Sequence, residues 1–220
     1  MQLLTFDIET APTSRALEAR YVPEDNPAPG NYKTPEAVAG HHARAESSFA
    51  EGLAKTASLN PRLGRIVCIG VGGKTWADVD EANEPALIAV ALKLIAEQSN
   101  AHVVTVNGKA FDFRFLFLRA AMLGVEINLP CKPDDYVRKY LRDPHIDLME
   151  VLNGSRPEKG DSLEGWAQAF GIDTSKVGSG ADIWPAVQRG DSAFISAHCA
   201  ADLSITAQLA AKLDAAGMLR

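Results

Sequence analysis

The stretch LLTFDIET, residues 3–10, has the apolar, aromatic and β-branched content of a buried strand, yet it carries two acids. Side chains two residues apart lie on the same face of a strand, so Asp7 and Glu9 point the same way. Adjacent carboxylates repel each other, and burying them is costly unless a cation compensates. Hard cations such as Mg²⁺ and Mn²⁺ prefer carboxylate oxygens. The stretch therefore predicts a metal site; the alternative is a strand that ends at Asp7, with both acids in solvent.

The whole chain is acidic and of ordinary size for one domain. Its 220 residues are 46% hydrophobic, and we expect a single domain over residues 1–220 with a long insertion at about 11–64. The net charge of -6 argues against bulk electrostatic binding of nucleic acid, but not against an enzyme that binds phosphates locally. We find no membrane span or signal peptide pattern and expect a cytoplasmic protein that binds no membrane. The three cysteines are predicted to be reduced.

The predicted insertion changes character along its length. Prolines interrupt its first half, whereas Thr34, followed by proline and glutamate, has the pattern of a helix start. We expect a helix over residues 36–59 that is interrupted at Gly40 and Gly52. Excursions of this length are commonly functional, so we expect the insertion to lie near the active face.

The rest of the chain alternates strands and helices before it becomes mostly helical. Residues 65–73 and the segment that begins at residue 74 predict a hairpin that continues the first strand as an antiparallel meander. The further elements expected are a helix over 84–98, a strand over 102–106, a helix over 112–123, a short helical segment over 145–152, a helix that ends at Gly171, and a helix from Asp191 to about Asp214. This order predicts an α/β fold with a mixed sheet flanked by helices.

Two further acids are placed so that they can join the first two. Asp112 follows a strand and a glycine turn, at the carboxyl edge of the sheet where α/β sites form. Asp202 lies in an apolar helix, where an unpaired aspartate is unusual. His198 stands one turn earlier on the same face of that helix. The helix therefore presents an acid and a base together.

Three segments carry a resemblance to a known family. DIE (residues 7–9), NGKAFD (residues 107–112) and HCAAD (residues 198–202) resemble, in this order, the motifs of the DEDD-type 3′-to-5′ exonucleases, which have a ribonuclease H-like fold. The most similar subgroup consists of stand-alone proteins related to the proofreading domain of family B DNA polymerases. Supporting matches outside the motifs are LGRIV (residues 63–67), HIDLME (residues 145–150) and SL (residues 162–163).

The resemblance implies a metal-dependent exonuclease that hydrolyses terminal phosphodiesters of single-stranded DNA from the 3′ end and releases nucleoside 5′-monophosphates. Asp7, Glu9 and Asp202 would hold the first of two ions, Mg²⁺ or Mn²⁺, which would ionise the attacking water. Asp7 would bridge to the second ion, which Asp112 would support through water and which would stabilise the departing 3′ oxygen. Two metals about 3.5 to 4 Å apart can stabilise both oxygens of an in-line displacement.

One position departs from the resembling subgroup. That subgroup usually has tyrosine four residues before the last aspartate, whereas a related subgroup has histidine five residues before it. His198 stands at the tyrosine spacing, and one residue on a helix corresponds to a rotation of about 100°. We hypothesise that His198 acts as a general base or orients the attacking water; the alternative is a histidine with a packing or surface role.

Other residues are candidates for contact with the nucleic acid. The resemblance suggests that Thr10, Asn107 and Phe111 contact the terminal nucleotides, although Phe111 is equally suited to be a core anchor. The basic residues nearest the site, or in the loop over residues 174–180, are candidates for contact with the phosphate backbone, namely Lys109, Arg114, Lys159 and Lys176.

Two alternative functions stay open on the sequence alone. The same fold could bind nucleic acid without catalysis, which the acidic composition and the presence of all four acids disfavour. The enzyme could instead act on short RNA, because metals recognise phosphates and sugar preference depends on the shape of the pocket. The expected partner is a nucleic acid 3′ end, DNA in the first place. Proofreading would also require replication or repair proteins, which the sequence does not identify.

Overall fold

The computed structural model describes residues 1–154, 162–175 and 177–219. Within these residues, a mixed sheet is made of five strands, β1 (Leu3–Pro12), β2 (Gly64–Val71), β3 (Lys74–Ala77), β4 (His102–Thr105) and β5 (His145–Asp147). The order across the sheet is β3-β2-β1-β4-β5. The β1–β2 and β2–β3 pairs are antiparallel, whereas the β1–β4 and β4–β5 pairs are parallel. The α/β fold with an antiparallel meander followed by parallel strands is thereby confirmed.

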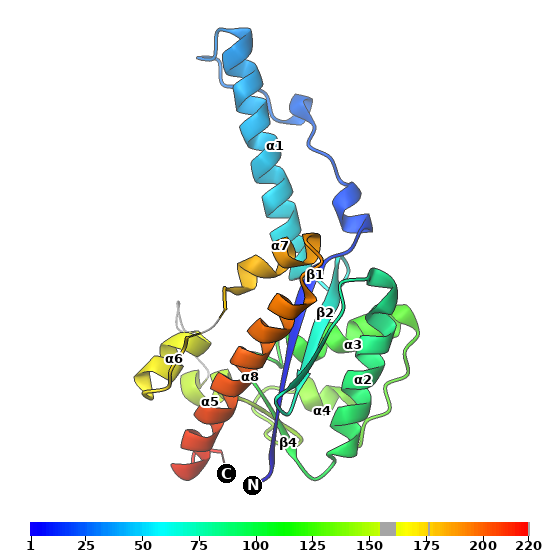
Figure 1. The fold of residues 1–220 in the computed structure, drawn as a ribbon, viewed down its shortest axis with the longest axis vertical. Coiled ribbons are helices and arrows are strands. Elements are labelled where there is room, and N and C mark those ends of the chain that lie inside the picture. Colours follow the sequence, from blue (N-terminus) through cyan, green and yellow to red (C-terminus); the bar gives the residue numbers. More distant parts are fainter. Residues whose placement is uncertain (155–161, 176, 220) are drawn as a thin grey trace.

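Helices cover both faces of this sheet (Figure 1). One face is covered by α2 (Glu84–Glu97), α3 (Asp112–Leu123) and α4 (Pro133–Val137). The other face is covered by the long helix α8 (Ser192–Ala215), around which lie the shorter helices α5 (Leu148–Asn153), α6 (Leu163–Ala169) and α7 (Ile183–Gln188). In the described part of the chain, no helix is long and apolar enough to cross a membrane.

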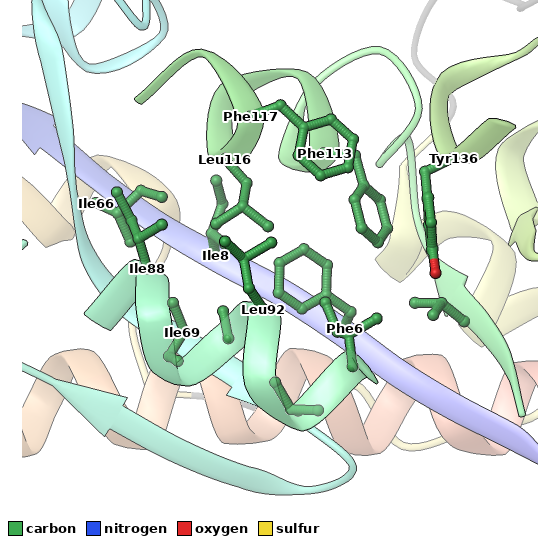
Figure 2. Packing of buried hydrophobic residues seen from close by; sticks show 14 of the residues in the cluster. Phe6, Ile8, Ile66, Ile69, Ile88, Leu92, Phe113, Leu116, Phe117 and Tyr136 are labelled. Carbon is green, nitrogen blue, oxygen red and sulfur yellow. The ribbon is translucent and has the colours of Figure 1, made fainter. Parts of the chain in front are cut away.

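Strand β1 sends its apolar and its acidic side chains to opposite faces of the sheet. Phe6 and Ile8 pack into the hydrophobic cluster that β1 shares with α2 and α3 (Figure 2). Because side chains alternate along a strand, Asp7 and Glu9 lie on the face covered by α8. A register shift between Glu9 and Thr10 interrupts the pairing with β2 directly after the second acid.

Between β1 and β2 the chain makes a long excursion, whose helix extends away from the sheet (Figure 1). The excursion contains the 3-10 turns η1 (Arg15–Glu18) and η2 (Pro23–Asp25) and helix α1 (Pro35–Ser58). The Thr34 hydroxyl accepts a hydrogen bond from Ala37 N at 3.2 Å, which confirms the predicted helix start. The interruptions expected at Gly40 and Gly52 do not occur. A glycine costs a helix interior only about 1 kcal/mol relative to alanine, and the alanine-rich neighbours continue the helix.

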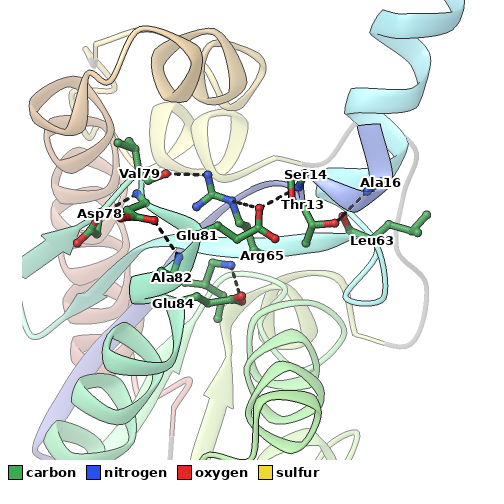
Figure 3. Close-up of polar contacts among 12 residues, drawn as sticks. Thr13, Ser14, Ala16, Leu63, Arg65, Asp78, Val79, Glu81, Ala82 and Glu84 are labelled. Carbon is green, nitrogen blue, oxygen red and sulfur yellow. Dashed lines mark hydrogen bonds and ion pairs between the residues drawn. The ribbon is translucent and has the colours of Figure 1, made fainter. Parts of the chain in front are cut away.

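The two ends of this excursion are joined to each other (Figure 3). The backbone N–H and the hydroxyl of Thr13 both donate to Leu63 O, at 2.8 and 2.9 Å. Ser14 N donates to the Glu81 carboxylate at 2.8 Å, and this carboxylate lies 3.9 Å from the Arg65 guanidinium. These contacts fix the base of α1 relative to β1 and β2.

The C-terminal half differs from expectation at two elements. Residues 145–147 form the edge strand β5, not the beginning of a helical segment, and α5 begins only at Leu148. Three residues are too few for the two-residue period of a strand to be visible in the sequence. Helix α7 is not predicted either, because it has six residues and contains Pro185. The long last helix is confirmed: Asp191 caps it by accepting a hydrogen bond from Phe194 N at 3.0 Å.

Candidate active site

Helix α8 packs unusually close to the sheet beside the acids of β1. Gly70 of β2 pairs with Asp7 across the antiparallel ladder. A Cβ atom at Gly70 would lie 2.5 Å from Leu203 Cδ1 and 2.7 Å from Cys199 Sγ, so only glycine leaves room for α8 at this distance. The close approach brings the side chains of α8 to the acids of β1.

Three of the predicted site residues meet at this contact. His198 Nε2 lies 3.8 Å from Glu9 Oε1 and 3.6 Å from Asp202 Oδ2. Glu9, His198 and Asp202 each offer a possible metal-ligating atom, and the three atoms lie within 4.8 Å of one another. Asp7 and Glu9 form a second group of this kind with Cys199. The two groups share Glu9, so the acids from both ends of the chain form one continuous cluster.

Asp112 approaches the cluster from the first turn of α3. The pairing of β4 with β1 ends at Thr5, and beyond this point Asp112 Oδ1 accepts a hydrogen bond from Ile8 N at 3.1 Å. The Asp112 side chain is 4% exposed. It lies outside the two groups of possible ligands, but its charge acts on those of Asp7 and Glu9. All four predicted acids are therefore in one electrostatic environment.

Burial and mutual repulsion favour protons on these carboxylates. The pKa of Glu9, which is 9% exposed, is raised well above its usual value, first by burial and then by the charge of Asp7. Burial and Asp7 also raise the pKa of Asp112, against the opposing effect of its hydrogen bond from Ile8 N. A divalent cation would lower these pKa values, because it stabilises the ionised carboxylates.

The His198 ring is buried and held on two sides. It is 2% exposed, and it stacks on Phe194 with ring centroids 6.5 Å apart and planes within 9°. Its Nδ1 lies 2.9 Å from Val177 O. A carbonyl oxygen only accepts hydrogen bonds, so Nδ1 carries the proton and Nε2 faces Glu9 and Asp202. The ring therefore points into the cluster; the role hypothesised for it stays a prediction.

Two cysteines border the cluster, and the sequence reasoning gave them no place there. Cys68 pairs with Glu9 across β1 and β2, and Cys199 lies within reach of Asp7 and Glu9. The spacing of Cys199 from Asp202, three residues on one helix, is the signal that could have shown this proximity. A hydrogen bond with Cys68 and burial raise the pKa of the Cys199 thiol. The thiol therefore stays neutral and does not suit a hard cation.

The turn that carries Asn107 and Asp112 is held by strand β5. The Asp147 carboxylate accepts hydrogen bonds from Asn107 N at 2.9 Å and from Lys109 N at 3.1 Å. Asn107 adopts the left-handed conformation, with φ of 62°, within this support. In the sequence, residues 145–150 are only a supporting match to the family. In the structure, Asp147 of this segment holds the turn that contains the NGKAFD motif.

Buried hydrogen bonds continue beneath the same turn. Gly108 N donates to Thr105 Oγ1 at 3.1 Å, and Thr105 Oγ1 lies 2.7 Å from His145 Nε2. His145 Nδ1 lies 2.5 Å from Tyr136 O and must be the donor to this carbonyl, so Nε2 accepts from the Thr105 hydroxyl. Burial lowers the pKa of His145 to about 3, and the ring is neutral. Every polar atom named here has a partner, which favours a single conformation of the turn.

Two of the four residues predicted to contact the phosphate backbone lie in the described part of the chain. Lys109 is 5% exposed, and its ammonium is bonded to Leu141 O and the Glu150 carboxylate. It therefore stabilises the turn, which is the structural role open to each of the four candidates. Arg114 is exposed on α3. Lys159 and Lys176 lie outside the described residues.

A cleft of about 710 Å³ opens directly beside Glu9. Thr10 and Phe111, two of the predicted substrate contacts, line it, and Asn107 lies exposed at the nearby turn. The Thr10 hydroxyl donates to Ser58 O at 2.7 Å and so also joins β1 to the end of α1. That these three residues contact a nucleotide stays a prediction.

The opposite walls of the cleft come from elements that carry no motif. Lys55 and Leu59 contribute from the end of α1, and Trp184, Pro185 and Gln188 contribute from α7. The sequence reasoning missed these residues. In the sequence, the excursion begins directly after Asp7 and Glu9. The end of α1 and helix α7 are distant from each other in sequence, and they meet beside these acids only in the folded chain.

The residues of the cluster fit a divalent cation. The carboxylates of Asp7, Glu9 and Asp202 could hold it, and oxygen ligands of this kind suit Mg²⁺ or Mn²⁺. The raised pKa values of Glu9 and Asp112 show that the protein alone does not compensate these buried charges. Such uncompensated, buried acids beside a cleft are typical of functional sites.

The sequence matches one family of known proteins. Residues 65–211 match the profile of a family described as predicted 3′-5′ exonucleases related to the exonuclease domain of PolB. The matched range includes Asp112, His198 and Asp202 and begins after the strand that carries Asp7 and Glu9. No curated protein matches the sequence significantly.

The fold resembles part of a solved polymerase structure. The family B DNA polymerase from the hyperthermophilic archaeon Pyrobaculum calidifontis superposes with a TM-score of 0.60 at 16% sequence identity. The superposition covers 96% of this chain and 24% of the polymerase chain, so the protein corresponds to about a quarter of that enzyme. Because the family profile extends over more than half of the sequence, the chain belongs to this family of predicted 3′-5′ exonucleases related to the exonuclease domain of PolB.

Proposed function

We propose that this protein hydrolyses the terminal phosphodiester at the 3′ end of single-stranded DNA, with two divalent cations, Mg²⁺ or Mn²⁺, and releases nucleoside 5′-monophosphates. The observation that carries the proposal is the convergence of Asp7, Glu9, Asp112 and Asp202 beside an open cleft. An assembly of buried and half-buried acids from three distant segments costs stability, so it needs a functional reason.

Each acid has a distinct position in the proposed chemistry. When bound, divalent cations in such a cluster activate water and stabilise the charge that develops on the attacking and departing oxygens. Glu9 and Asp202 face one another with His198 between them and would hold one cation. The charge of Asp7 acts on both Glu9 and Asp112, and Asp7 would serve both cations. The hydrogen bond from Ile8 N fixes the orientation of Asp112.

The cleft beside Glu9 suits the last nucleotides of a single strand. Phe111 and Trp184 offer aromatic surface to nucleobases, and stacking on aromatic side chains accepts any base. Lys55 lines the cleft and would contact the phosphate backbone. The Glu9 wall of the same cleft would bring the terminal phosphodiester to the acids.

The test compares labels at the two ends of one single-stranded DNA. With Mn²⁺ or Mg²⁺, a 3′-labelled strand should release its label at once as a mononucleotide, whereas a 5′-labelled strand should shorten stepwise. EDTA should stop both reactions. Duplex DNA and RNA of the same sequence, in parallel reactions, measure the substrate preference.

Two matched variants test whether hydrolysis depends on the acid cluster or on acidic residues elsewhere on the surface. Asp7→Asn should abolish hydrolysis while leaving the fold intact, whereas Glu97→Gln removes a carboxylate from the exposed face of α2 and should leave the rate unchanged. Release of internal fragments or of the 5′ label first would contradict the proposed polarity. Full activity in Asp7→Asn would contradict the proposed site.

A further inference from the structure

We propose that His198 is a direct ligand of the divalent cation held by Glu9 and Asp202, through its Nε2 atom. This inference rests on the proposed metal site, but not on the hydrolysis of DNA. It replaces the hypothesis that the ring acts as a general base, and it assigns a nitrogen ligand to a site whose other ligands are oxygens.

The first argument is the state of the two ring nitrogens. The Nδ1–H group donates to Val177 O at 2.9 Å, so Nε2 is the ring nitrogen that faces Glu9 and Asp202. Histidines that ligate metals commonly donate their other N–H group to a backbone carbonyl, which fixes the tautomer and the ring orientation. His198 has this arrangement.

The second argument is distance. Two atoms that each lie about 2.1 Å from one ion are at most about 4.2 Å apart. His198 Nε2 lies 3.8 Å from Glu9 Oε1 and 3.6 Å from Asp202 Oδ2, within this limit. One cation placed between these three atoms would be attracted by all of them.

The third argument is that the ring cannot move easily. It is 2% exposed and stacked on Phe194. The loop that supplies the Val177 carbonyl passes close to Phe194 at Gly178, where a Cβ atom would lie 2.6 Å from Phe194 Cζ. Gly178 has a φ of 67°, so glycine satisfies both the close approach and the backbone conformation.

These constraints favour a ligand over a base. A general base must reach the water that it deprotonates and pass the proton on in each turnover. The His198 ring is enclosed, and both of its nitrogens face protein groups. Rigid, oriented and buried rings are what a metal site requires.

A nitrogen ligand has a consequence for the choice of metal. Mg²⁺ prefers oxygen ligands, whereas Mn²⁺ and later transition metals accept imidazole more readily. The site should therefore bind Mn²⁺ more tightly than Mg²⁺, and this preference should depend on His198. An oxygen-only site of Glu9 and Asp202 would discriminate less.

The test is electron spin echo spectroscopy of the full-length protein with Mn²⁺ and no nucleic acid. The wild-type protein should show ¹⁴N modulation from an imidazole nitrogen bound to Mn²⁺, and labelling with [¹⁵N]histidine should change it to the ¹⁵N pattern. His198→Gln should abolish the modulation. His102→Gln, which removes a ring at the beginning of β4, should retain it.

Calorimetric titration gives a second readout on the same proteins. His198→Gln should bind Mn²⁺ at least about tenfold more weakly, with a smaller change for Mg²⁺. Mn²⁺ that binds to the wild-type protein without any ¹⁴N modulation would overturn the assignment and leave the proposed exonuclease intact. A wild-type protein that binds no Mn²⁺ would overturn both.

Discussion

Asp7 and Glu9 lie where their negative charges reduce the stability of the fold. Both lie on one face of the central strand, against a helix that carries Asp202. Burial and the charge of Asp7 raise the pKa of Glu9, which means that the ionised cluster is unfavourable in the absence of a cation. The same residues should therefore make the protein depend on metal for its stability at neutral pH.

Removal of one charge should stabilise the metal-free protein. Asp7→Asn eliminates the largest charge repulsion on Glu9 and Asp112, so the free energy of unfolding should rise. The expected rise in melting temperature in EDTA is about 2–4 °C. Added Mg²⁺ should stabilise the wild-type protein much more than the variant. A lower melting temperature for Asp7→Asn in EDTA would show that the cluster is not under repulsive strain.

The stabilisation by Mg²⁺ should grow with pH. The folded pKa values of Glu9 and Asp112 are raised, so protonation of these carboxyls stabilises the fold fully below the unfolded pKa and is lost as pH rises through the folded pKa. Mg²⁺ competes with those protons and compensates the charges that appear. The difference in melting temperature between Mg²⁺ and EDTA should therefore be small near pH 5 and large near pH 8.

The difference between the melting temperatures in Mg²⁺ and in EDTA excludes the effect of groups that titrate equally in both conditions. His145, whose pKa is lowered to about 3 by burial, destabilises the fold as pH falls below the usual histidine range, with or without Mg²⁺. Its contribution cancels between the two conditions. A Mg²⁺ effect that does not change between pH 5 and 8 would contradict the account of the carboxyls.

Among the elements, the turn between β4 and α3 shows how a short edge strand supports a site. Strand β5 has only three residues, yet its Asp147 accepts hydrogen bonds from Asn107 N and Lys109 N, and Glu150 just beyond it binds the Lys109 ammonium. This support sets the position at which α3 begins, and Asp112 is the first residue of that helix. The strand therefore acts on the acid cluster without containing any of its members.

Asp147→Asn tests this support. The amide that replaces one carboxylate oxygen would face a backbone N–H donor, so one hydrogen bond becomes a repulsive contact. We expect a loss of about 1–3 kcal/mol in the free energy of unfolding, together with slower hydrolysis. Denaturant unfolding measures the first effect. Asp134→Asn, an exposed acid on α4, is the control and should change neither quantity.

The elements also show which parts of the structure the sequence could predict. Helices with a cap and a long apolar stripe, such as α3 and α8, were identifiable because their signals are local and repeat over several turns. Strand β5 and helix α7 are too short to carry a period, and their conformations depend on neighbours that are distant in sequence. The motif residues are identifiable from the sequence, whereas the structural role of Lys109 is not, because its partners Leu141 and Glu150 are set by tertiary structure.

At the scale of the whole molecule, the excursion between β1 and β2 and helix α7 enclose the site. The end of α1 and α7 form walls of the cleft beside Glu9, while the rest of α1 extends away from the sheet (Figure 1). These walls could not be predicted from the sequence, because neither carries a motif and their proximity arises only when the excursion is anchored at Thr13 and Leu63. The acids determine the chemistry, and these walls would determine how the strand enters.

Trp184→Ala tests the role of these walls. The indole lines the cleft, and stacking of a nucleobase on an aromatic side chain contributes about 1–3 kcal/mol. Binding of a fluorescent single-stranded DNA in Ca²⁺ or EDTA should weaken by that amount, whereas calorimetric Mn²⁺ affinity should not change. Leu118→Ala, an exposed apolar residue on α3, serves as the control. Equal DNA affinity in both variants would place the strand outside this cleft.

The most direct test of the central claim, that the four acids form one metal-dependent hydrolytic centre, is a crystal structure with Mn²⁺ and a nucleoside 5′-monophosphate. The anomalous difference map should show one or two Mn²⁺ peaks ligated by Asp7, Glu9 and Asp202, with the product phosphate beside them and its base in the cleft of Phe111 and Trp184. Asp112 should lie next to the second ion. Absence of Mn²⁺ from these acids, with the nucleotide bound elsewhere, would contradict the claim.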